Sequence, residues 1–327
     1  MDVLDRLRMD VPVAQAGMGG GIAGPDLAVA VANAGGLGTL GWMPADWLRR
    51  SIDRVRADAP GRAVAVNLLM PFVRRADVRV CVQSRIDVAV IAFGGDSGLV
   101  RELRDAGVFV FVMVGTADQA RRAVQWGADG LIAQGGEAGG HLTGTTPASE
   151  FLPTALNLAT GRPVLLAGGI ADAADTKKAL SEGASAVVAG TRFLLTHESG
   201  AHPEYQRRVL AAETTYRTTL FGFGWPAPHR VVPNAATARW CHADGTAKLS
   251  PRLVNAPSAV VARLGNVSPY LLSRAQSPRL PLFSPVAPVK QMPASSVDRT
   301  ALYAGESVLR MTKVTSAREA VAELAAI

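Results

Sequence analysis

Residues 130–141 read GLIAQGGEAGGH, a short apolar run that ends in a glutamine, four glycines and a histidine. The run Gly130–Gln134 predicts a buried β-strand. Glycines allow a backbone to approach a flat or phosphorylated ligand because no Cβ stands in the way. His141 can exchange a proton near neutral pH. The stretch therefore predicts a strand whose end carries a cofactor seat beside an acid/base group.

The same unit, an apolar run followed by an amphipathic helix, recurs through residues 1–213. Several expected helices begin at Ser, Thr or Asp and end at glycine, as helix caps require. Eight strands with eight following helices predict an α/β fold, a (β/α)8 TIM barrel. The expected strands are Val13–Ala16, Leu37–Gly41, Ala63–Leu69, Val88–Phe93, Val108–Met113, Gly130–Gln134, Pro163–Ala167 and Ala186–Ala189. The expected helices are Asp26–Ala34, Ala45–Ala57, Ala76–Arg85, Ser97–Ala106, Thr116–Trp126, Pro147–Ala159, Asp172–Glu182 and His202–Glu213.

The chain changes character after residue 213. Eleven of its 20 prolines fall between Pro226 and Pro293, where the alternation stops. We predict a cofactor-binding barrel over residues 1–213 and a smaller substrate or lid domain at residues 214–300, over the barrel mouth. Residues 301–327 are expected to form a C-terminal segment whose helix, Ser316–Ala326, returns to the barrel.

Composition excludes several classes of protein. Of 327 residues, 48% are hydrophobic and 19% charged, which is typical of a protein with a large core. No secretory signal pattern opens the sequence, so we expect a cytoplasmic protein with no membrane partner. The two cysteines lack metal-ligand spacing, and no metal site is expected.

The basic excess is confined to the last third. Residues 214–327 hold 13 Lys/Arg against 5 Asp/Glu, a net charge of +8, whereas residues 1–213 carry −1. No aromatic platform or nucleic-acid reader motif accompanies this charge, and no nucleic-acid partner is expected. A solvated basic surface and a basic rim that attracts anionic substrates are the two remaining interpretations.

Glycines cluster where the expected strands end. Ligand groups of a TIM barrel lie at the C-terminal ends of the strands, and phosphates bind after strands seven and eight. The first strand runs into Gly17, Met18 and Gly19; the seventh and eighth end in Gly168-Gly169 and Gly190-Thr191. Backbone N–H groups, a hydroxyl and nearby helix N-termini there suit a phosphate dianion. Each pair alone is more often an ordinary turn, and their joint placement favours the phosphate site.

Two amides and one histidine complete the candidate site. Asn67 and Gln134, at strand ends, can pair with a heterocycle that offers donors and acceptors. For either amide alone, satisfying loop backbone is an equal alternative. His141 is interpreted as functional because it follows Gln134 by seven residues. The other histidines, including His229, are interpreted as surface or packing residues.

The sequence also contains a match to the dinucleotide-binding fingerprint. Residues 19–24 match G-x-G-x-x-G, but no ribose-binding acid ends the next strand at Leu37–Gly41. Eight βα units also exceed a simple doubly wound domain. We therefore reject a Rossmann site.

With these motifs the sequence resembles the nitronate monooxygenase (2-nitropropane dioxygenase-like) family, which is close to the flavin-dependent enoyl-acyl-carrier-protein reductases. The resemblance covers residues 10–215 and is specific to the superfamily rather than to one reaction. It is carried by residues 12–18, 32–38, 66–68, 134–141, 167–172 and 190–193.

The resemblance implies FMN bound noncovalently at the C-terminal end of the barrel. By carry-over, Gly17, Met18 and Gly19 line the flavin, and Asn67 and Gln134 pair with its ring. The catalytic residue is His141. Many relatives have proline where this chain has Gly17, a departure that loosens the first loop. The remaining cofactor contacts are Gly139, Gly168, Gly169, Gly190 and Thr191. The last four of these contact the phosphate.

Three functions follow from this resemblance. The leading one is oxidation of a small anionic nitronate with O2, in which a protonated or hydrogen-bonding His141 holds or deprotonates the substrate. The alternative is an NAD(P)H-dependent reductase of enoyl thioesters or quinones. The basic charge of residues 214–327 slightly favours this alternative. The third is a flavin-binding protein without turnover. A homodimer is the expected assembly.

Overall fold

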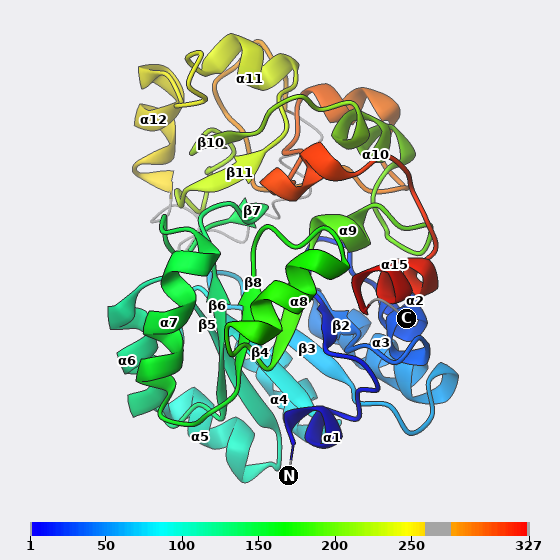
Figure 1. Cartoon of the computed structure of the whole chain (residues 1–327). Helices are drawn as coiled ribbons and strands as arrows, with labels where there is room; N and C mark the ends of the chain where they lie inside the picture. The colour runs from blue at the N-terminus through cyan, green and yellow to red at the C-terminus, as the bar shows by residue number, and fades with distance from the viewer. Residues whose placement is uncertain (1, 259–275, 326–327) are drawn as a thin grey trace. The chain divides into compact units, whose positions relative to one another are not determined.

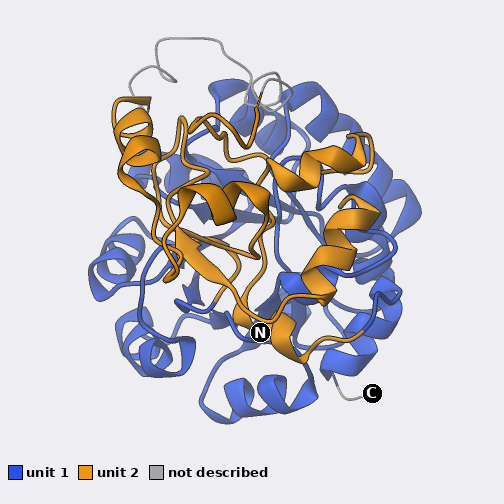
Figure 2. Cartoon of the chain, turned by 90° about the horizontal axis from the view of Figure 1, so that it is seen from above, with its two compact units in different colours: residues 1–137, 143–200, 313–327 blue, residues 138–142, 201–312 orange. Residues whose placement is uncertain are grey.

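The computed structural model describes residues 2–258 and 276–325 of the chain. Contacts divide the chain into two compact units, which Figure 2 colours separately. The first unit comprises Met1–Glu137, Thr143–Gly200 and Lys313–Ile327, and the second comprises Ala138–Leu142 and Ala201–Thr312. The division into residues 1–213, 214–300 and 301–327 rests on composition and stays a prediction.

The first unit is a parallel β-barrel with helices outside it (Figure 1). Hydrogen-bonded neighbours follow the order β1-β9-β8-β6-β5-β4-β3-β2, and a parallel bridge between Ala14 and Leu37 closes the ring. The (β/α)8 prediction is thereby confirmed. The strands are β1 (Val13–Gln15), β2 (Thr39–Leu40), β3 (Ala65–Leu69), β4 (Val88–Ala92), β5 (Phe109–Val114), β6 (Gly130–Gln134), β8 (Val164–Ala167) and β9 (Ala186–Ala189).

Both faces of these strands are buried. Phe111 and Ile132 belong to the cluster that fills the ring, whereas their neighbours Val110 and Leu131 belong to the cluster shared with the helices. Because βα connections place helices over the outer face of a parallel sheet, its strands consist of continuous apolar runs rather than alternating patterns. This is why the sequence predicted them well.

The outer helices begin and end where the sequence places caps. Asp96 and Thr116 accept hydrogen bonds from the N–H groups of Leu99 and Gln119, and such caps stabilise a helix by about 1 kcal/mol. The expected helix at Ala76–Arg85 is confirmed as α4. The helices are α1 (Val3–Leu7), α2 (Pro25–Asn33), α3 (Ala45–Asp58), α4 (Arg75–Gln83), α5 (Ser97–Asp105), α6 (Ala117–Gln125), α7 (Ala148–Ala159) and α8 (Ala173–Ser181).

The eighth barrel helix differs from the expectation. The segment expected at His202–Glu213 forms α10 (Pro203–Leu210), which belongs to the second unit. After β9 only the single turn α9 (Thr191–Leu194) follows, and α15 (Ala317–Ala325) packs against both α2 and α8. The larger segment of the second unit, Ala201–Thr312, is thus inserted in the sequence between the last strand and α15. Helix α15 belongs to the first unit, together with the barrel strands.

The second unit contains a three-stranded sheet that the sequence did not predict. Its order is β10 (Tyr216–Thr218), β11 (His229–Val231) and β7 (Gly140–His141), with both pairings antiparallel. Leu220, Phe221, Val231 and Phe283 lie in its core. The other elements described here are α11 (Ala235–Trp240), α12 (Leu249–Asn255), η1 (Ala294–Asp298) and η2 (Glu306–Arg310).

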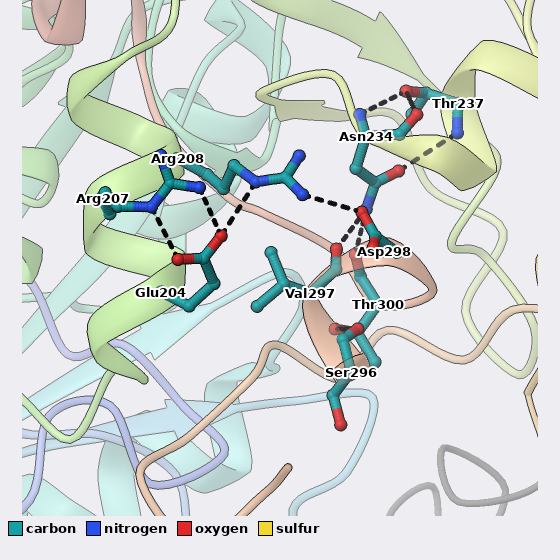
Figure 3. A network of polar contacts seen from close by, with 9 residues as sticks. All are labelled: Glu204, Arg207, Arg208, Asn234, Thr237, Ser296, Val297, Asp298 and Thr300. Atoms are coloured by element: carbon teal, nitrogen blue, oxygen red, sulfur yellow. Dashed lines mark hydrogen bonds and ion pairs between the residues drawn. The ribbon is translucent and has the colours of Figure 1, made fainter. Parts of the chain in front are cut away.

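A polar network ties three elements of the second unit together (Figure 3). Glu204 on α10 accepts hydrogen bonds from Arg207 and Arg208, and Arg208 reaches Asp298 of η1 at 3.1 Å. Asn234 donates to the carbonyls of Val297 and Thr300, each at 2.8 Å, and caps α11. Since these carbonyls are buried, Asn234 satisfies groups that water cannot reach.

Across the described part of the chain, no helix has the length and apolar character needed to span a bilayer.

Candidate functional site

Gly17, just after β1, meets Asn67 in the middle of β3. The Asn67 amide nitrogen donates to the Gly17 carbonyl at 2.7 Å. A Cβ at Gly17 would overlap the Asn67 Cβ and lie 3.0 Å from its Cγ, so glycine is required while Asn67 keeps this position. The amide nitrogen is held by the first loop, which leaves the Asn67 oxygen as the end that can accept a hydrogen bond from a ligand.

Met18 and Gly19 pass close to the end of β2. A Cβ at Gly41 would overlap the Met18 carbonyl, and one at Gly19 would lie 3.7 Å from the Trp42 carbonyl. Glycine at position 41 therefore permits the close approach of the loop that carries Met18 and Gly19.

Gln134, at the end of β6, is buried and held by Thr143. Its Oε1 accepts hydrogen bonds from the Thr143 N–H and hydroxyl, both at 2.8 Å. Gln119 on α6 in turn donates to the Thr143 carbonyl at 3.0 Å and accepts from the Gly115 N–H at 2.7 Å. The amide of Gln134 is thereby fixed in orientation. Sequence reasoning missed Thr143 and Gln119, because no local pattern links them to Gln134.

The glycine pair Gly168-Gly169 turns the chain after β8 with φ values of 114° and 73°, which favour glycine. Glu137 lies against this turn: a Cβ at Gly168 would lie 3.2 Å from its Oε1. The Glu137 carboxylate also accepts from the Ala148 N–H at 3.0 Å and so caps the start of α7.

The N-terminus of α8, which follows the Gly168-Gly169 turn, is capped by its own side chains. Asp172 accepts from the N–H groups of Ala174 and Asp175. Asp175 in turn accepts from the Ala171 N–H at 2.7 Å. These donors are occupied by negative charge.

His141 lies in the second unit, in strand β7. Its ring stacks on Trp225 with centroids 3.5 Å apart and planes inclined by 8°. The ring of His229 lies at 4.9 Å and that of Tyr303 at 5.5 Å. Gly139 belongs to the same unit, and a Cβ there would lie 2.5 Å from the Gly305 nitrogen. His141 is therefore enclosed by aromatic side chains and only 8% exposed.

Both ring nitrogens of His229 are engaged by backbone. Its Nδ1 lies 3.0 Å from the Ala227 carbonyl and must donate, while its Nε2 accepts from the Phe221 N–H at 3.2 Å. This pattern requires the neutral imidazole. Burial lowers the pKa of His229 to about 4. Of the two interpretations from sequence, surface or packing residue, burial of His229 fits the second, and neither predicted its position beside His141.

His141 is neutral near pH 7 for the same physical reason. Burial lowers the pKa of its imidazole well below the usual value, and the neighbouring His229 lowers it further. Of the two forms considered from sequence, the hydrogen-bonding neutral histidine fits the structure and the protonated one does not.

The structure thus groups the predicted residues in two sets. The first unit brings Gly17 against Asn67 and places the other barrel residues at strand ends; Gly139 and His141 belong to the second unit.

These features define a (β/α)8-barrel protein with glycines after its strands, one amide (Asn67) within β3 and another (Gln134) at the end of β6. The family described as "Nitronate monooxygenase" matches residues 3–77 and 57–326. The chain belongs to this family.

Curated relatives include proteins of two named activities. The chain is 39% identical over 229 residues to a (3aS,4S,5R,7aS)-5-hydroxy-7a-methyl-1-oxo-octahydro-1H-indene-4-carboxyl-CoA dehydrogenase of Mycobacterium tuberculosis, covering 68% of this chain and 62% of the relative. It is 31% identical over 266 residues to a probable nitronate monooxygenase of Bacillus subtilis, covering 67% and 76%. The match to the first relative spans less than two thirds of that protein's length.

Solved structures match nearly the whole chain. A nitroalkane oxidase from Streptomyces ansochromogenes has a TM-score of 0.79 at 27% identity, covering 99% of this chain and 97% of the other. FabK from Thermotoga maritima has a TM-score of 0.78 at 26% identity, covering 98% and 94%.

Proposed function

We propose that this protein is an FMN-dependent oxidoreductase that oxidises alkyl nitronates with O2. Proteins of its family and its structural neighbours are flavoproteins, and the flavin assigned to this chain is FMN. The observation that carries the proposal is the family match over residues 57–326 together with the glycines after the barrel strands and the two amides, Asn67 within β3 and Gln134 at the end of β6. When bound, the flavin supplies the electron-accepting chemistry that no amino-acid side chain provides.

The barrel residues fit such a group. The Asn67 oxygen is an acceptor suited to the ring N–H of a flavin, since its nitrogen is held by Gly17. Gln134, fixed by Thr143, supplies the second amide. A Cβ at Gly190 would meet only the Ala16 Cβ, at 3.7 Å, so this turn leaves room for a bulky group. Gly168-Gly169 and Gly190-Thr191 are assigned to the phosphate.

His141 is assigned to the substrate. A neutral imidazole has one N–H and one lone pair, so it can donate a hydrogen bond to a nitronate oxygen, or accept the α-proton of the neutral nitroalkane and so generate the nitronate. The aromatic side chains of Trp225 and Tyr303 keep water from the ring, which strengthens any hydrogen bond it makes. His141 therefore positions the anion by a hydrogen bond without carrying a fixed positive charge.

A second candidate function is NAD(P)H-linked redox chemistry on an acyl thioester. It is favoured by the 39% identity to a relative named as a CoA-thioester dehydrogenase. The net charge of +8 over residues 214–327 would attract the phosphates of such a substrate. The same His141 serves either reaction.

One anaerobic experiment separates the candidates. The purified protein is mixed with an alkyl nitronate and, separately, with NADH or NADPH, while the flavin absorbance is followed. Bleaching by the nitronate supports the monooxygenase. Bleaching by the pyridine nucleotide alone overturns it in favour of the second candidate, and no bleaching by either contradicts both. A protein that takes up no FMN contradicts the cofactor assignment itself.

A further inference from the structure

Arg192 is a buried cation directly after the Gly190-Thr191 turn. Its side chain is 4% exposed. The Nη2 group donates to the Thr315 hydroxyl and lies 3.5 Å from the Leu195 carbonyl. The Nη1 group lies 4.0 Å from the Glu323 carboxylate. A buried guanidinium is tolerated only with such partners, so the C-terminal segment is what allows Arg192 to occupy this position.

The C-terminal segment is attached to the same part of the barrel by its backbone. Thr315 bridges Thr196, accepts from the His197 N–H at 2.9 Å and donates its N–H to the Leu195 carbonyl at 3.2 Å. Glu198 accepts from the Ala317 N–H at 2.9 Å and so caps α15. The residues just after α9 therefore hold the chain that enters α15 and the first residue of this helix.

The Gly190-Thr191 turn depends on this attachment. Helix α9 has only four residues, too few to be stable alone in water. Its backbone bonds, from Leu194 to Gly190 and from Leu195 to Thr191, start at the turn itself. Tertiary contacts must hold the turn in shape, and the contact of Arg192 with Glu323 is one that reaches α15.

We propose that Arg192, Thr315 and Glu323 form a clasp through which α15 positions the Gly190-Thr191 turn for the flavin phosphate. Docking of α15 and binding of FMN are then coupled. Arg192 is a positioning residue rather than a phosphate ligand, because both of its Nη groups face the C-terminal segment. The clasp rests on the proposed function, since it presumes that the turn receives the phosphate.

The coupling has a thermodynamic consequence. A ligand that binds only the docked state stabilises that state, and the effect is reciprocal. FMN should therefore slow hydrogen exchange of the α15 amides, and loss of the clasp should weaken FMN binding. Coupling of this kind between two sites typically amounts to about 5- to 150-fold in affinity.

The test uses the full-length protein freed of bound flavin and titrated with FMN. The variants are Arg192→Met, Thr315→Val, which removes only the hydroxyl, and Glu323→Ala. The matched control is Arg318→Met, which makes the same change at an exposed arginine of α15. We expect FMN affinity to fall about tenfold or more in Arg192→Met, to fall by less in the other two, and to stay unchanged in the control. Hydrogen exchange of residues 317–325 should slow on FMN binding less in Arg192→Met than in the wild type.

Two results would overturn the clasp. One is wild-type FMN affinity in folded Arg192→Met, and the other is an exchange rate of α15 that FMN does not alter. Should Arg192→Met fail to fold, unchanged affinity in both Thr315→Val and Glu323→Ala overturns the clasp equally. Failure of the wild type to bind FMN is a separate outcome, because it contradicts the proposed function before the clasp is tested.

Discussion

His141 and His229 are register partners in the antiparallel pair β7–β11, and their ring centroids lie 4.9 Å apart. Two imidazoles at this distance cannot both be protonated cheaply in a buried setting. The backbone resolves the conflict by fixing His229 as the neutral form, with Nδ1 donating and Nε2 accepting. His141 therefore faces an uncharged neighbour on this side.

The buried histidines predict that stability falls on mild acidification. The pKa of His229 is lowered to about 4 in the folded chain, so the unfolded state binds more protons than the folded state below its ordinary value of about 6.5. Stability should therefore decrease as the pH falls from about 6.5 toward 4, by at most about 3 kcal/mol for this group. Urea unfolding at pH 7.5, 6 and 5 measures the slope. His229→Gln should flatten it, and equal slopes in wild type and variant would contradict the prediction.

His141→Ala should lose turnover and keep the flavin. Removal of a group that transfers or holds a proton typically costs about 10²- to 10⁴-fold in rate, whereas the residues assigned to the flavin ring and phosphate lie in the barrel. The measurement pairs steady-state turnover with the flavin content of the purified variant. His242→Ala is the control, because His242 is exposed. Loss of flavin in His141→Ala would show that this residue supports the cofactor site rather than the reaction.

Much of the barrel could be read from the sequence because its determinants are local. Strands β6 and β9 begin and end at the predicted residues, since a strand buried on both faces is a bounded apolar run. The strand assignments then place Gly17 just after β1, Asn67 within β3 and Gln134 at the end of β6 with no further information. Hence the predictable part of the site is the part that regular βα units position.

The remainder depends on contacts between distant parts of the chain. Strand β7 has two residues and exists because Gly140 and His141 pair with Arg230 and His229. No local pattern distinguishes α10 from α15 as the eighth barrel helix, since both are amphipathic and only packing against α2 and α8 decides. The neutrality of His229 likewise depends on backbone groups, the carbonyl of residue 227 and the N–H of residue 221, that no short pattern brings together.

Gly17→Ala should weaken FMN binding by displacing Asn67. The added Cβ would overlap the Asn67 side chain, which must move or give up its hydrogen bond to residue 17. Overpacking of this kind typically costs about 1–3 kcal/mol. FMN titration and urea unfolding measure the two effects. Gly24→Ala is the control: its Cβ would meet nothing within 4 Å, and stability should change by about 1 kcal/mol or less. Equal FMN affinity in Gly17→Ala and the wild type would show that Asn67 does not contribute to the site.

Asn234→Ala should destabilise the second unit without altering FMN affinity. The buried amide caps α11 and satisfies the carbonyls of Val297 and Thr300 (Figure 3). Loss of the cap costs about 1 kcal/mol, and each buried group left without a partner adds about 1–3 kcal/mol. Asn234→Asp separates the two contributions, because aspartate keeps the capping oxygen and lacks the two donors. Urea unfolding should therefore give the wild type a higher free energy of unfolding than either variant. FMN affinity should be the same in all three proteins. A stability of Asn234→Asp equal to that of the wild type would mean that the carbonyls of Val297 and Thr300 are satisfied by water, and that the capping oxygen alone accounts for the effect of Asn234→Ala.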